Sequence, residues 1–472
     1  MTTGHRLAGP AIDLPASGRR RGGAALPVTV LTGLLVLLLG RVGGDARWLG
    51  ALGRIVAATR QIPDGIPFAA APSAGWPNVP VLAELILSLP QTLGGDDGLL
   101  VVQALAVVAA LLVLTGDARR AGATDRSTTV ALAVVAVGGC TSLLIVRLQV
   151  FSLVLLPLEL LLLRSQARRP TPRVWLLVPL LALWSNLHGA ALLGLALAVT
   201  YLVLERARQR PLEAALVGVA SALSLSLTPA LAATTSYYLN VLGNESARQH
   251  TGLWARLSWH SPFDVVLVLV VAALLPAVRR SRPRLWEYAA LAGLAAATVQ
   301  TARNGIWLLF ALVGPAATGW SVRRFPSRPD ARPGAGQRWA AGGAVALAGL
   351  IHGLLSPAGA SPLVAVAVAS AAGRPVAAEG VLSEQVAAAG GQVWVTNPLD
   401  AFSRADQRRF LTWSATGRTD LLPADSPVVL VAAGGAAAAG LARDRRFRVL
   451  TADRSCTLYL RRPSTPSPPP AG

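Results

Sequence analysis

Residues 148–173 read LQVFSLVLLPLELLLLRSQARRPTPR, and this arrangement recurs along most of the chain. The first 16 residues of the stretch hold one charged side chain, Glu159, and the next ten hold four arginines. Such an apolar block approaches the length of about 20 residues that an α-helix needs to cross a bilayer. A succession of these blocks, separated by charged connections, predicts an all-α polytopic membrane protein.

The composition excludes several classes of protein. Of the 472 residues, 53% are hydrophobic and 14% are charged, whereas ordinary soluble domains have about 25% charged residues. A soluble enzyme, a disordered chain and a fibrous protein are therefore excluded. A net charge of +20 would indicate a nucleic-acid partner in a soluble protein. Here the 43 basic residues, all arginines, lie mostly between the apolar blocks, so membrane lipid and no nucleic acid is the expected partner.

The apolar blocks predict about eleven transmembrane helices. They cover residues 25–41, 98–115, 128–146, 148–163, 174–188, 189–204, 212–228, 263–278, 286–301, 304–321 and 339–355. Segment 79–93 is also apolar, but counting it as a span would invert the orientation of every later one. We therefore expect it to form an interfacial or re-entrant helix.

The arginines predict the orientation of the spans. The N-terminal tail and one set of alternate connections carry 23 arginines, and the opposite set with its span ends carries 8. Because positive residues favour the cytoplasmic side, residues 1–24 are predicted to form a cytoplasmic tail in the cytoplasmic (inner or plasma) membrane. A polytopic membrane domain follows at 25–355, with a large first outer loop at 42–97 and a second at 229–262.

Residues 356–462 are less hydrophobic and contain more Pro, Gly and Asp. Helices are expected at 376–389 and 436–443, and strands at 392–396, 427–431, 446–451 and 456–460. Alternating strands and helices predict a small α/β domain on the extracytoplasmic side of the membrane. The Pro- and Ser-rich tail, 463–472, is expected to be disordered.

Polar side chains gather at the predicted outer ends of the spans. The candidate site residues are Asp45, Glu84, Arg147, Gln149, Asn186, His188, Arg303 and Asn304. Ionisable groups at a membrane are costly, so each is a functional hypothesis. Each also has a simpler interpretation as a solvated loop residue, a capped helix end or an arginine that snorkels to the lipid headgroups. Glu159, near the inner end of its span, is expected to snorkel and is given no role.

Group transfer from a lipid-linked donor is the chemistry that suits such a site. Arginines at headgroup level can pair with the donor phosphate, and a carboxylate beside it can remove a proton from an acceptor hydroxyl. The sequence holds no nucleotide-binding loop and no zinc-ligand spacing, so no cofactor is predicted. A divalent metal is left as an alternative, since Asp96-Asp97 is half of an Asp-x-Asp motif.

Several motifs resemble those of the GT-C fold membrane glycosyltransferases. They are Asp45 with Trp48 and Gly53, Ile62-Pro63, Pro67-Phe68, Trp76, Leu82-Ala83-Glu84, Arg147-Leu148-Gln149-Val150-Phe151-Ser152, Leu183 to Gly189 (Leu-Trp-x-Asn-x-His-Gly), Ala302-Arg303-Asn304, Asn397-Pro398-Leu399-Asp400 and Gly417-Arg418-Thr419-Asp420. The resemblance covers roughly residues 25–425. It implies a GT-C-like fold, a polyprenyl-phosphate sugar as donor, and Asp45 as the catalytic base.

The chain departs from the family pattern in two places. The first loop has one acidic residue near the end of the span, where many members have a pair. The second outer loop reads Thr251-Gly252-Leu253-Trp254, where members more often carry an acidic residue before the tryptophan.

The sequence therefore predicts a membrane glycosyltransferase that acts at the outer face on an unknown glycan, lipid or protein acceptor. Two alternatives are a non-catalytic relative that binds a glycan or a partner, and a lipid or sugar transporter. Transporters often contain internal repeats and have their sites near the membrane midplane. No repeat is visible, and the polar residues lie at span ends, which favours the transferase.

Overall fold

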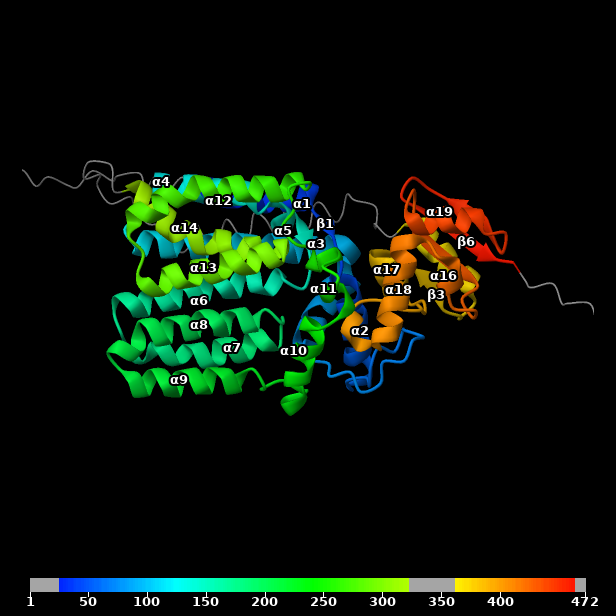
Figure 1. The fold of residues 1–472 in the computed structure, drawn as a ribbon, viewed down its shortest axis with the longest axis horizontal. Helices are drawn as coiled ribbons and strands as arrows, with labels where there is room; N and C mark the ends of the chain where they lie inside the picture. Colours follow the sequence, from blue (N-terminus) through cyan, green and yellow to red (C-terminus); the bar gives the residue numbers. More distant parts are fainter. Residues whose placement is uncertain (1–24, 322–360, 463–472) are drawn as a thin grey trace, which may run out of the picture.

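The computed structural model describes residues 25–321 and 361–462, which form a bundle of helices and a C-terminal domain at one end of it (Figure 1). The bundle consists of α1 (Ala25–Leu39), α3 (Val81–Arg120), α4 (Asp125–Gly138), α6 (Val150–Arg168), α7 (Leu177–Ser185), α8 (Ala191–Leu204), α9 (Pro211–Ser224), α12 (Pro262–Ser281), α13 (Leu285–Gln300) and α14 (Gly305–Ser321). Ten of the eleven predicted spans contain one of these helices, and the eleventh, 339–355, lies outside the described residues.

Apolar side chains cover the outside of the bundle as well as its interior. On α9, Leu212, Leu216, Val219 and Leu223 are between 50% and 72% exposed. Their spacing of three or four residues places them on one stripe of the helix. A stripe of this size is unfavourable in water and suits a surface that faces lipid. Within the described residues, α3, α6 and α12 are each long and apolar enough to cross a membrane.

Two breaks interrupt the helices. The predicted span 128–146 is not one helix, because α4 ends at Gly138 and a short helix, α5 (Cys140–Leu144), leads into an extended segment. Helix α3 consists of two helical parts that meet at a kink at Gly95, where the backbone is non-helical, so the segment 79–93 is separated from the span at 98–115 as predicted. At this bend the backbone of Gly98 approaches the Pro90 carbonyl so closely that an added Cβ would lie 2.0 Å from it.

Successive connections alternate between the two ends of the bundle. The connections α3–α4, α6–α7, α8–α9 and α12–α13 lie at the end away from the C-terminal domain (Figure 1). This end carries arginines 119, 120, 126, 164, 168, 169, 173, 206, 208, 210, 279, 280, 282 and 284. The arginine-rich connections and the C-terminal domain are thus at opposite ends, as the predicted topology requires.

Four helices meet at a buried ion network near the arginine-rich end. Arg164 of α6 pairs with Asp117 of α3 (Nη1–Oδ2, 2.6 Å) and with Glu287 of α13 (Nε–Oε1, 3.0 Å), and it donates to the Ala311 carbonyl of α14 at 2.7 Å. Loss of one partner of such a buried pair leaves an uncompensated charge, at a cost of about 3–5 kcal/mol. The network therefore fixes how these four helices are arranged.

The expectation that Glu159 snorkels is wrong. Its side chain is 0% exposed in the middle of α6, and neither carboxylate oxygen has a hydrogen-bond partner among the described residues. Helix α6 approaches Gly194 of α8 closely at this point. A Cβ added to Gly194 would lie 3.0 Å from Glu159 Oε2.

The C-terminal domain is a small α/β unit. Its mixed sheet has the order β3-β4-β6-β5, where β3 (Val376–Ala378) is parallel to β4 (Val428–Ala432), and β6 (Cys456–Arg461) is antiparallel to β4 and to β5 (Phe447–Ala452). Helices α16 (Pro362–Ala371), α17 (Gly380–Ala388), α18 (Arg404–Thr416) and α19 (Ala436–Arg443) accompany the sheet. The predicted helix 376–389 is therefore wrong at its start, which is β3, and the predicted strand 392–396 makes only isolated bridges at Val393.

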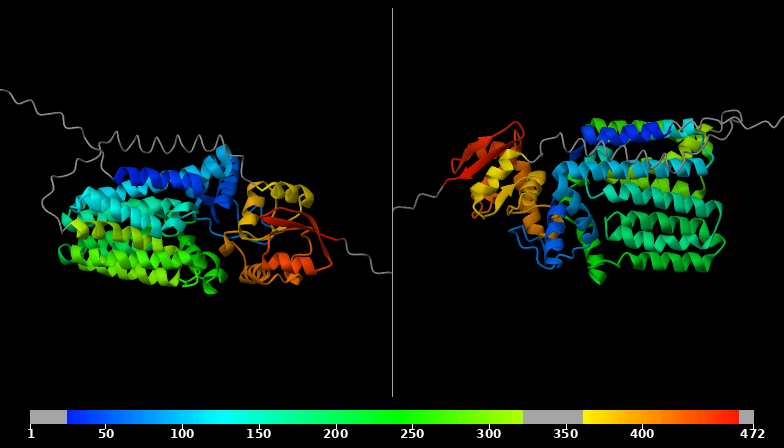
Figure 2. Two further views of the ribbon diagram at one scale, coloured as in Figure 1. Left: turned by 90° about the horizontal axis from the view of Figure 1, so that it is seen from above. Right: turned by 180° about the vertical axis from the view of Figure 1, so that it is seen from behind.

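The remaining elements lie in the connections and in the C-terminal domain. Those at the end of the bundle nearest this domain are α2 (Ala46–Thr59), α10 (Thr234–Leu242), α11 (Glu245–Arg248), the strands β1 (Arg41–Val42) and β2 (Ile145–Val146), and the 3₁₀ turns η3 (Leu231–Ala233), η4 (Gly252–Trp254) and η5 (Ala302–Asn304). The turns η1 (Pro172–Leu176) and η2 (Arg206–Arg208) lie in the arginine-rich connections, and η6 (Leu399–Ala401) and η7 (Thr419–Leu421) belong to the C-terminal domain. Figure 2 shows α2, in blue, at the end of the bundle that meets the C-terminal domain.

The first loop is hydrogen-bonded to the C-terminal domain along its backbone. Val393 N–H donates to the Phe68 carbonyl at 2.9 Å, Ala70 N–H to the Val393 carbonyl at 2.8 Å, and Ala71 N–H to the Trp394 carbonyl at 3.0 Å. Because these bonds join residues more than 300 positions apart in the chain, they fix the domain against the loop that contains Asp45.

We expect Glu159→Met to raise the melting temperature of the detergent-solubilised protein by a few degrees. A buried carboxyl group without a partner costs about 1–3 kcal/mol, and methionine has a similar length without the polar atoms. Glu213→Met is the matched control, because Glu213 pairs with the buried Arg206 at 2.7 Å and its loss should lower the melting temperature. A lower melting temperature for Glu159→Met would show that Glu159 has a stabilising partner.

Candidate active site

A two-residue parallel ladder brings the central residues of the site together. β1 pairs with β2 through Arg41 with Ile145 and Val42 with Val146, and Gly43 N–H extends the ladder to the Val146 carbonyl at 3.0 Å. Asp45 follows one strand and Arg147 the other. Gly43 is needed for this approach, because an added Cβ would lie 2.5 Å from the Ile145 side chain and 3.4 Å from Arg147 Nε.

Asp45 lies immediately before α2, in an unusual backbone conformation. Its φ of 82° is positive, which costs about 1 kcal/mol or more for a residue with a side chain. A residue at this position commonly caps the helix with its side chain, but the Asp45 side chain makes no capping hydrogen bond to the described N-terminus of α2. The carboxylate is therefore not used to cap its own helix.

Two arginines face this carboxylate. Burial raises the pKa of Asp45 above its ordinary value, while Arg303 and Arg147 act in the opposite direction. Burial likewise lowers the pKa of each arginine, and Asp45 offsets part of that effect. Within the described residues, Arg147 Nε is buried with no hydrogen-bond acceptor. Two cations around one carboxylate leave a positive charge that suits an anionic ligand such as a phosphate.

A tryptophan holds Arg303 in place. Arg303 lies in η5, and its Cζ is 4.1 Å from the centre of the Trp254 ring. Stacking of this kind fixes a guanidinium plane and leaves its edge free to donate hydrogen bonds. The Thr251-Gly252-Leu253-Trp254 segment, which departs from the family pattern, thus contributes Trp254 to the site.

His188 is held as a neutral imidazole. Its Nδ1 lies 2.6 Å from Ser152 Oγ, and Ser152 Oγ in turn accepts a hydrogen bond from Trp184 Nε1 at 2.6 Å. Because Ser152 accepts from the indole, its own hydroxyl proton is free to be donated to Nδ1, which places the imidazole proton on Nε2. Burial and the nearby Arg303 lower the pKa of His188 to about 3.

The Leu-Trp-x-Asn-x-His-Gly motif therefore forms a turn that contacts three other elements. Trp184 and His188 both bond Ser152 of α6, and Asn186 Nδ2 donates to the Ala182 and Leu227 carbonyls at 2.8 and 2.7 Å. Gly189 faces α10, where an added Cβ would lie 3.6 Å from the Tyr237 hydroxyl.

Three predicted site residues use their amide nitrogens to hold turns. Besides Asn186, Gln149 Nε2 donates to the Ser142 carbonyl at 3.3 Å, and Asn304 Nδ2 to the Ala297 carbonyl at 3.0 Å. These turns carry His188, Arg147 and Arg303, respectively. The amides thus position His188 and the two arginines, and direct contact of these amides with substrate stays a prediction.

Glu84 is buried in the first turn of α3, in the part of this helix that belongs to the first outer loop. Its Oε2 accepts from Asn78 Nδ2 at 3.1 Å, while Oε1 is buried with no partner among the described residues. Burial, and then the charges of Asp400, Tyr238, Asp45 and Glu84, raise the pKa of the Tyr237 phenol. The structure therefore gathers Asp45, Glu84, Arg147, His188 and Arg303 at one end of the bundle.

The C-terminal domain adds three residues that the sequence did not single out. Glu384 Oε1 accepts from the Asp45 N–H at 2.9 Å and from Asn397 Nδ2 at 2.8 Å. Asp400 Oδ2 accepts from Trp76 Nε1 at 2.9 Å. Asn397 and Asp400 belong to the Asn-Pro-Leu-Asp motif, which marked the segment without giving it a role, whereas no local signal distinguished Glu384.

The Asp96-Asp97 pair does not resemble a metal site in the structure. Asp96 accepts two hydrogen bonds from Arg47, from Nε at 3.0 Å and from Nη2 at 2.6 Å. Across 25–321 and 361–462, there is no group of three or more His, Cys, Asp or Glu side chains placed to hold a metal ion. A role for a divalent metal stays an untested alternative.

The fold is that of the GT-C membrane glycosyltransferases. It resembles the arabinofuranosyltransferase AftD from Mycobacteria with a TM-score of 0.52 and 14% identity, covering 92% of this chain and 41% of that one. It also resembles ArnT from Cupriavidus metallidurans, in the apo state (TM-score 0.52, 13% identity, 92% and 96% of the chains) and bound to undecaprenyl phosphate (0.50, 12%, 92% and 97%). No protein-family model and no curated protein matches the sequence.

These similarities show the fold. The chain spans less than half the length of AftD and nearly the whole of ArnT. The expected GT-C fold is confirmed, whereas the donor, the acceptor and the site residues are not tested by similarity at 12–14% identity.

We expect the His188 imidazole to remain neutral between pH 5 and 9 in the folded protein. Mass spectrometry of deuterium exchange at its C2–H should therefore show no titration step in this range. Arg303→Gln should move the pKa upward from about 3, because it removes the cation that disfavours the imidazolium, while burial still keeps the pKa below its ordinary value. A midpoint near 6.5 in the wild-type protein would contradict the buried, neutral His188 described above.

Proposed function

We propose that this protein is a membrane glycosyltransferase that uses a polyprenyl-phosphate sugar as donor and a hydroxyl group as acceptor. The observation that carries the proposal is the buried Asp45 carboxylate on which the charges of Arg303 and Arg147 act, with Gly43 of the same turn held on the Val146 carbonyl next to Arg147, at the end of an apolar helical bundle. The GT-C fold is consistent with this class of reaction.

The site residues supply each part of an inverting transfer. The acceptor oxygen attacks the anomeric carbon and forms the new C–O bond, while the bond between that carbon and the phosphate oxygen breaks. The acceptor proton moves to the Asp45 carboxylate, and the bonding electrons leave with the polyprenyl phosphate. Arg147 and Arg303 stabilise the charge on the departing phosphate.

The raised pKa of Asp45 suits a general base, because proton transfer is most efficient when the pKa of the base is near the working pH. Asp45 must be ionised to accept the proton, so the rate rises with pH as Asp45 ionises. Arg303 and Arg147 oppose the effect of burial and keep part of the carboxylate ionised at lower pH.

A lipid-linked donor is supported by two features. ArnT, which has this fold, is bound to undecaprenyl phosphate in one solved structure. In the present chain, the outside of the bundle is apolar up to the site, so a polyprenyl tail can lie along the helices while its phosphate reaches the arginines. The arginine-rich connections at the opposite end support a site on the outer face of the cytoplasmic membrane.

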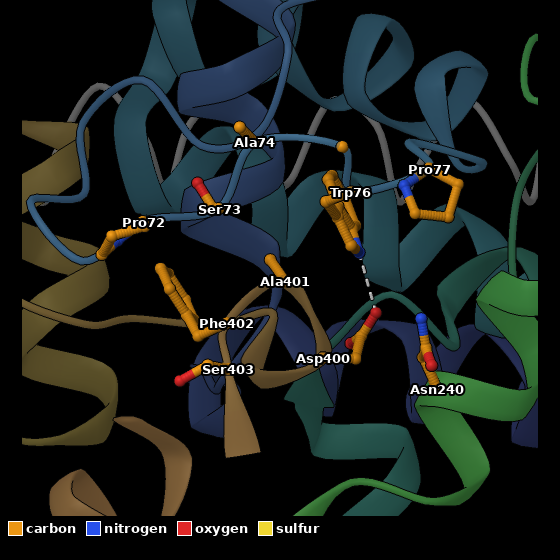
Figure 3. Close-up of a pocket in the computed structure, with 11 residues that line it drawn as sticks. Pro72, Ser73, Ala74, Trp76, Pro77, Asn240, Asp400, Ala401, Phe402 and Ser403 are labelled. Carbon is orange, nitrogen blue, oxygen red and sulfur yellow. Dashed lines mark hydrogen bonds between the residues drawn. The ribbon is translucent and has the colours of Figure 1, made fainter. Parts of the chain in front are cut away.

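A pocket beside the site suits the acceptor. It has a volume of about 370 Å³ and lies between the first loop (72–77), Asn240 of α10 and residues 400–403 of the C-terminal domain (Figure 3). Trp76 lines the pocket and packs edge-on against Trp48, with the ring centroids 6.2 Å apart, and Trp48 lies one turn after Asp45. Asp400 and Asn240 face this pocket as hydrogen-bonding groups for acceptor hydroxyls.

We expect Asp45→Asn to lower the release of sugar from polyprenyl-phosphate donors by about 100-fold or more, because the amide cannot accept the acceptor proton. Purified protein should be assayed with a panel of such donors. Asp64→Asn is the matched control, because Asp64 is an exposed carboxylate of the same loop that bonds Gly75 N–H and lies outside the site. Equal turnover by wild-type and Asp45→Asn protein would exclude Asp45 as the base.

We expect Ala74→Trp to reduce transfer to the acceptor and to leave donor binding unchanged. Ala74 is an exposed residue that lines the pocket, so an indole there fills space without disturbing the buried core. Ala70→Trp, at an exposed position of the same loop outside the pocket lining, should behave as wild type. Equal acceptor saturation curves for the Ala74→Trp and wild-type proteins would place the acceptor elsewhere.

A further inference from the structure

Glu384 of the C-terminal domain is a buried carboxyl group that bonds both its own domain and the backbone of Asp45. Its side chain is 0% exposed, and Oε1 receives the Asp45 N–H at 2.9 Å and Asn397 Nδ2 at 2.8 Å. Oε2 has no partner in the described parts of the chain. A buried carboxyl group without an ion-pair partner is unfavourable for stability alone, so its position calls for another explanation.

The contact fixes the one backbone group that determines where Asp45 points. Asp45 has a φ of 82° and a ψ of −36°, and α2 begins at the next residue. A positive φ at a residue with a side chain persists only where its surroundings hold it. The Asp45 N–H is held by Glu384, whereas Gly43 N–H is held by the β1–β2 ladder. The turn is thus fixed from both sides, by the bundle and by the C-terminal domain.

The surroundings of α2 make this contact rigid. Helix α17, which carries Glu384, packs along α2, and Arg54 near the other end of α2 donates to the Ala388 carbonyl at the end of α17 at 2.8 Å. Two hydrogen bonds therefore join α17 to α2 and to the residue that precedes it. A movement of the C-terminal domain away from the bundle would break both contacts and release the Asp45 turn.

The charge state of Glu384 is linked to Asp45. Burial, and then the charge of Asp45, raise the pKa of Glu384 to about 8, while the bonds from Asp45 N–H and Asn397 and the nearby Arg47 act in the opposite direction. Glu384 is therefore mostly protonated at neutral pH and accepts the two hydrogen bonds as a neutral carboxyl group. Above pH 8 it ionises beside the Asp45 carboxylate, and the like charges repel each other.

We propose that Glu384 is a positioning residue for Asp45, and that the catalytic site is complete only when the C-terminal domain is docked on α2. The proposal rests on the function proposed for Asp45, but the hydrogen bond that carries it can be tested without any activity.

Hydrogen–deuterium exchange measures this contact directly. In full-length protein, peptides covering residues 43–49 should be protected, and Glu384→Ala should lower that protection by exposing the Asp45 N–H, while Gly43 N–H keeps its bond to the Val146 carbonyl. The matched control is Glu379→Ala, because Glu379 is a glutamate of the same domain that accepts a backbone N–H, from Ala432 at 2.8 Å, within the domain itself. It should leave residues 43–49 protected. Unchanged protection in Glu384→Ala would overturn the proposal whether or not the protein is an enzyme.

Kinetics separate positioning from a purely structural role. Glu384→Ala should lower kcat by about 10- to 100-fold, because a base that is displaced from the acceptor hydroxyl transfers the proton less efficiently. The KM for the donor should change little. Glu384→Gln should retain most activity at pH 7, since a carboxamide oxygen can accept the same hydrogen bonds. The wild-type rate should fall as pH rises through about 8, and Glu384→Gln should lose this alkaline decline.

The outcomes distinguish the two proposals. If Glu384→Ala loses protection but keeps the wild-type kcat, Glu384 orders the turn without positioning a base, and the proposal fails. If the wild-type protein turns over no donor, the proposed function fails, and the exchange experiment still decides whether Glu384 holds the Asp45 turn.

Discussion

The pairing of β1 with β2 is the constraint on which the site depends. The strand β1 follows α1, and the strand β2 directly precedes Arg147. These two-residue strands form a parallel ladder at the end of the bundle. Parallel pairs are uncommon without a crossover helix between them, and here α2, α3, α4 and α5 make up the connection. Because the ladder joins the exits of two helices, it sets the distance between an aspartate and an arginine that lie 102 positions apart in the sequence.

The electrostatics of the site follow from that arrangement. A carboxylate and two guanidiniums share a partly buried region, where both arginines oppose the effect of burial on the pKa of Asp45 and Asp45 opposes the effect of burial on the pKa of each arginine. Burial, and then the charge of Arg303, lower the pKa of His188, so the imidazole serves as a hydrogen-bonding group and adds no further positive charge. The Trp254 ring holds Arg303 without neutralising it. The region thus retains a net attraction for an anion, in a place that apolar side chains surround.

The parts of this structure that could be predicted are those that leave a local signal. Apolar blocks and arginine runs predicted ten helices of the bundle and the alternation of their ends, and the motifs around Asp45, Arg147, His188 and Arg303 predicted residues that the fold brings together. The kink at Gly95 lies where the segment 79–93 was separated from the next span. The break at Gly139 was not predicted, because an apolar block has the same composition whether its helix is continuous or interrupted.

The contribution of the C-terminal domain could not be predicted for a different reason. Glu384 lies in an ordinary helix, and its importance comes from a contact with a residue 339 positions away. The burial of Glu159 could not be predicted for the same reason. Hydropathy places this residue along its helix but does not show which side chains of other helices cover it. Contacts of this kind depend on tertiary packing, which leaves no periodic pattern in the sequence.

The long-range contact at Asp45 also has a consequence for the order in which the protein is made. A ribosome synthesises Asp45 early and Glu384 only after all the described helices of the bundle, so the Asp45 turn has no acceptor for its N–H while those helices enter the membrane. The backbone hydrogen bonds between Phe68, Ala70 or Ala71 and residues 393–394 form at the same late stage. Biosynthesis therefore assembles the helical bundle first, and the C-terminal domain then completes the Asp45 turn.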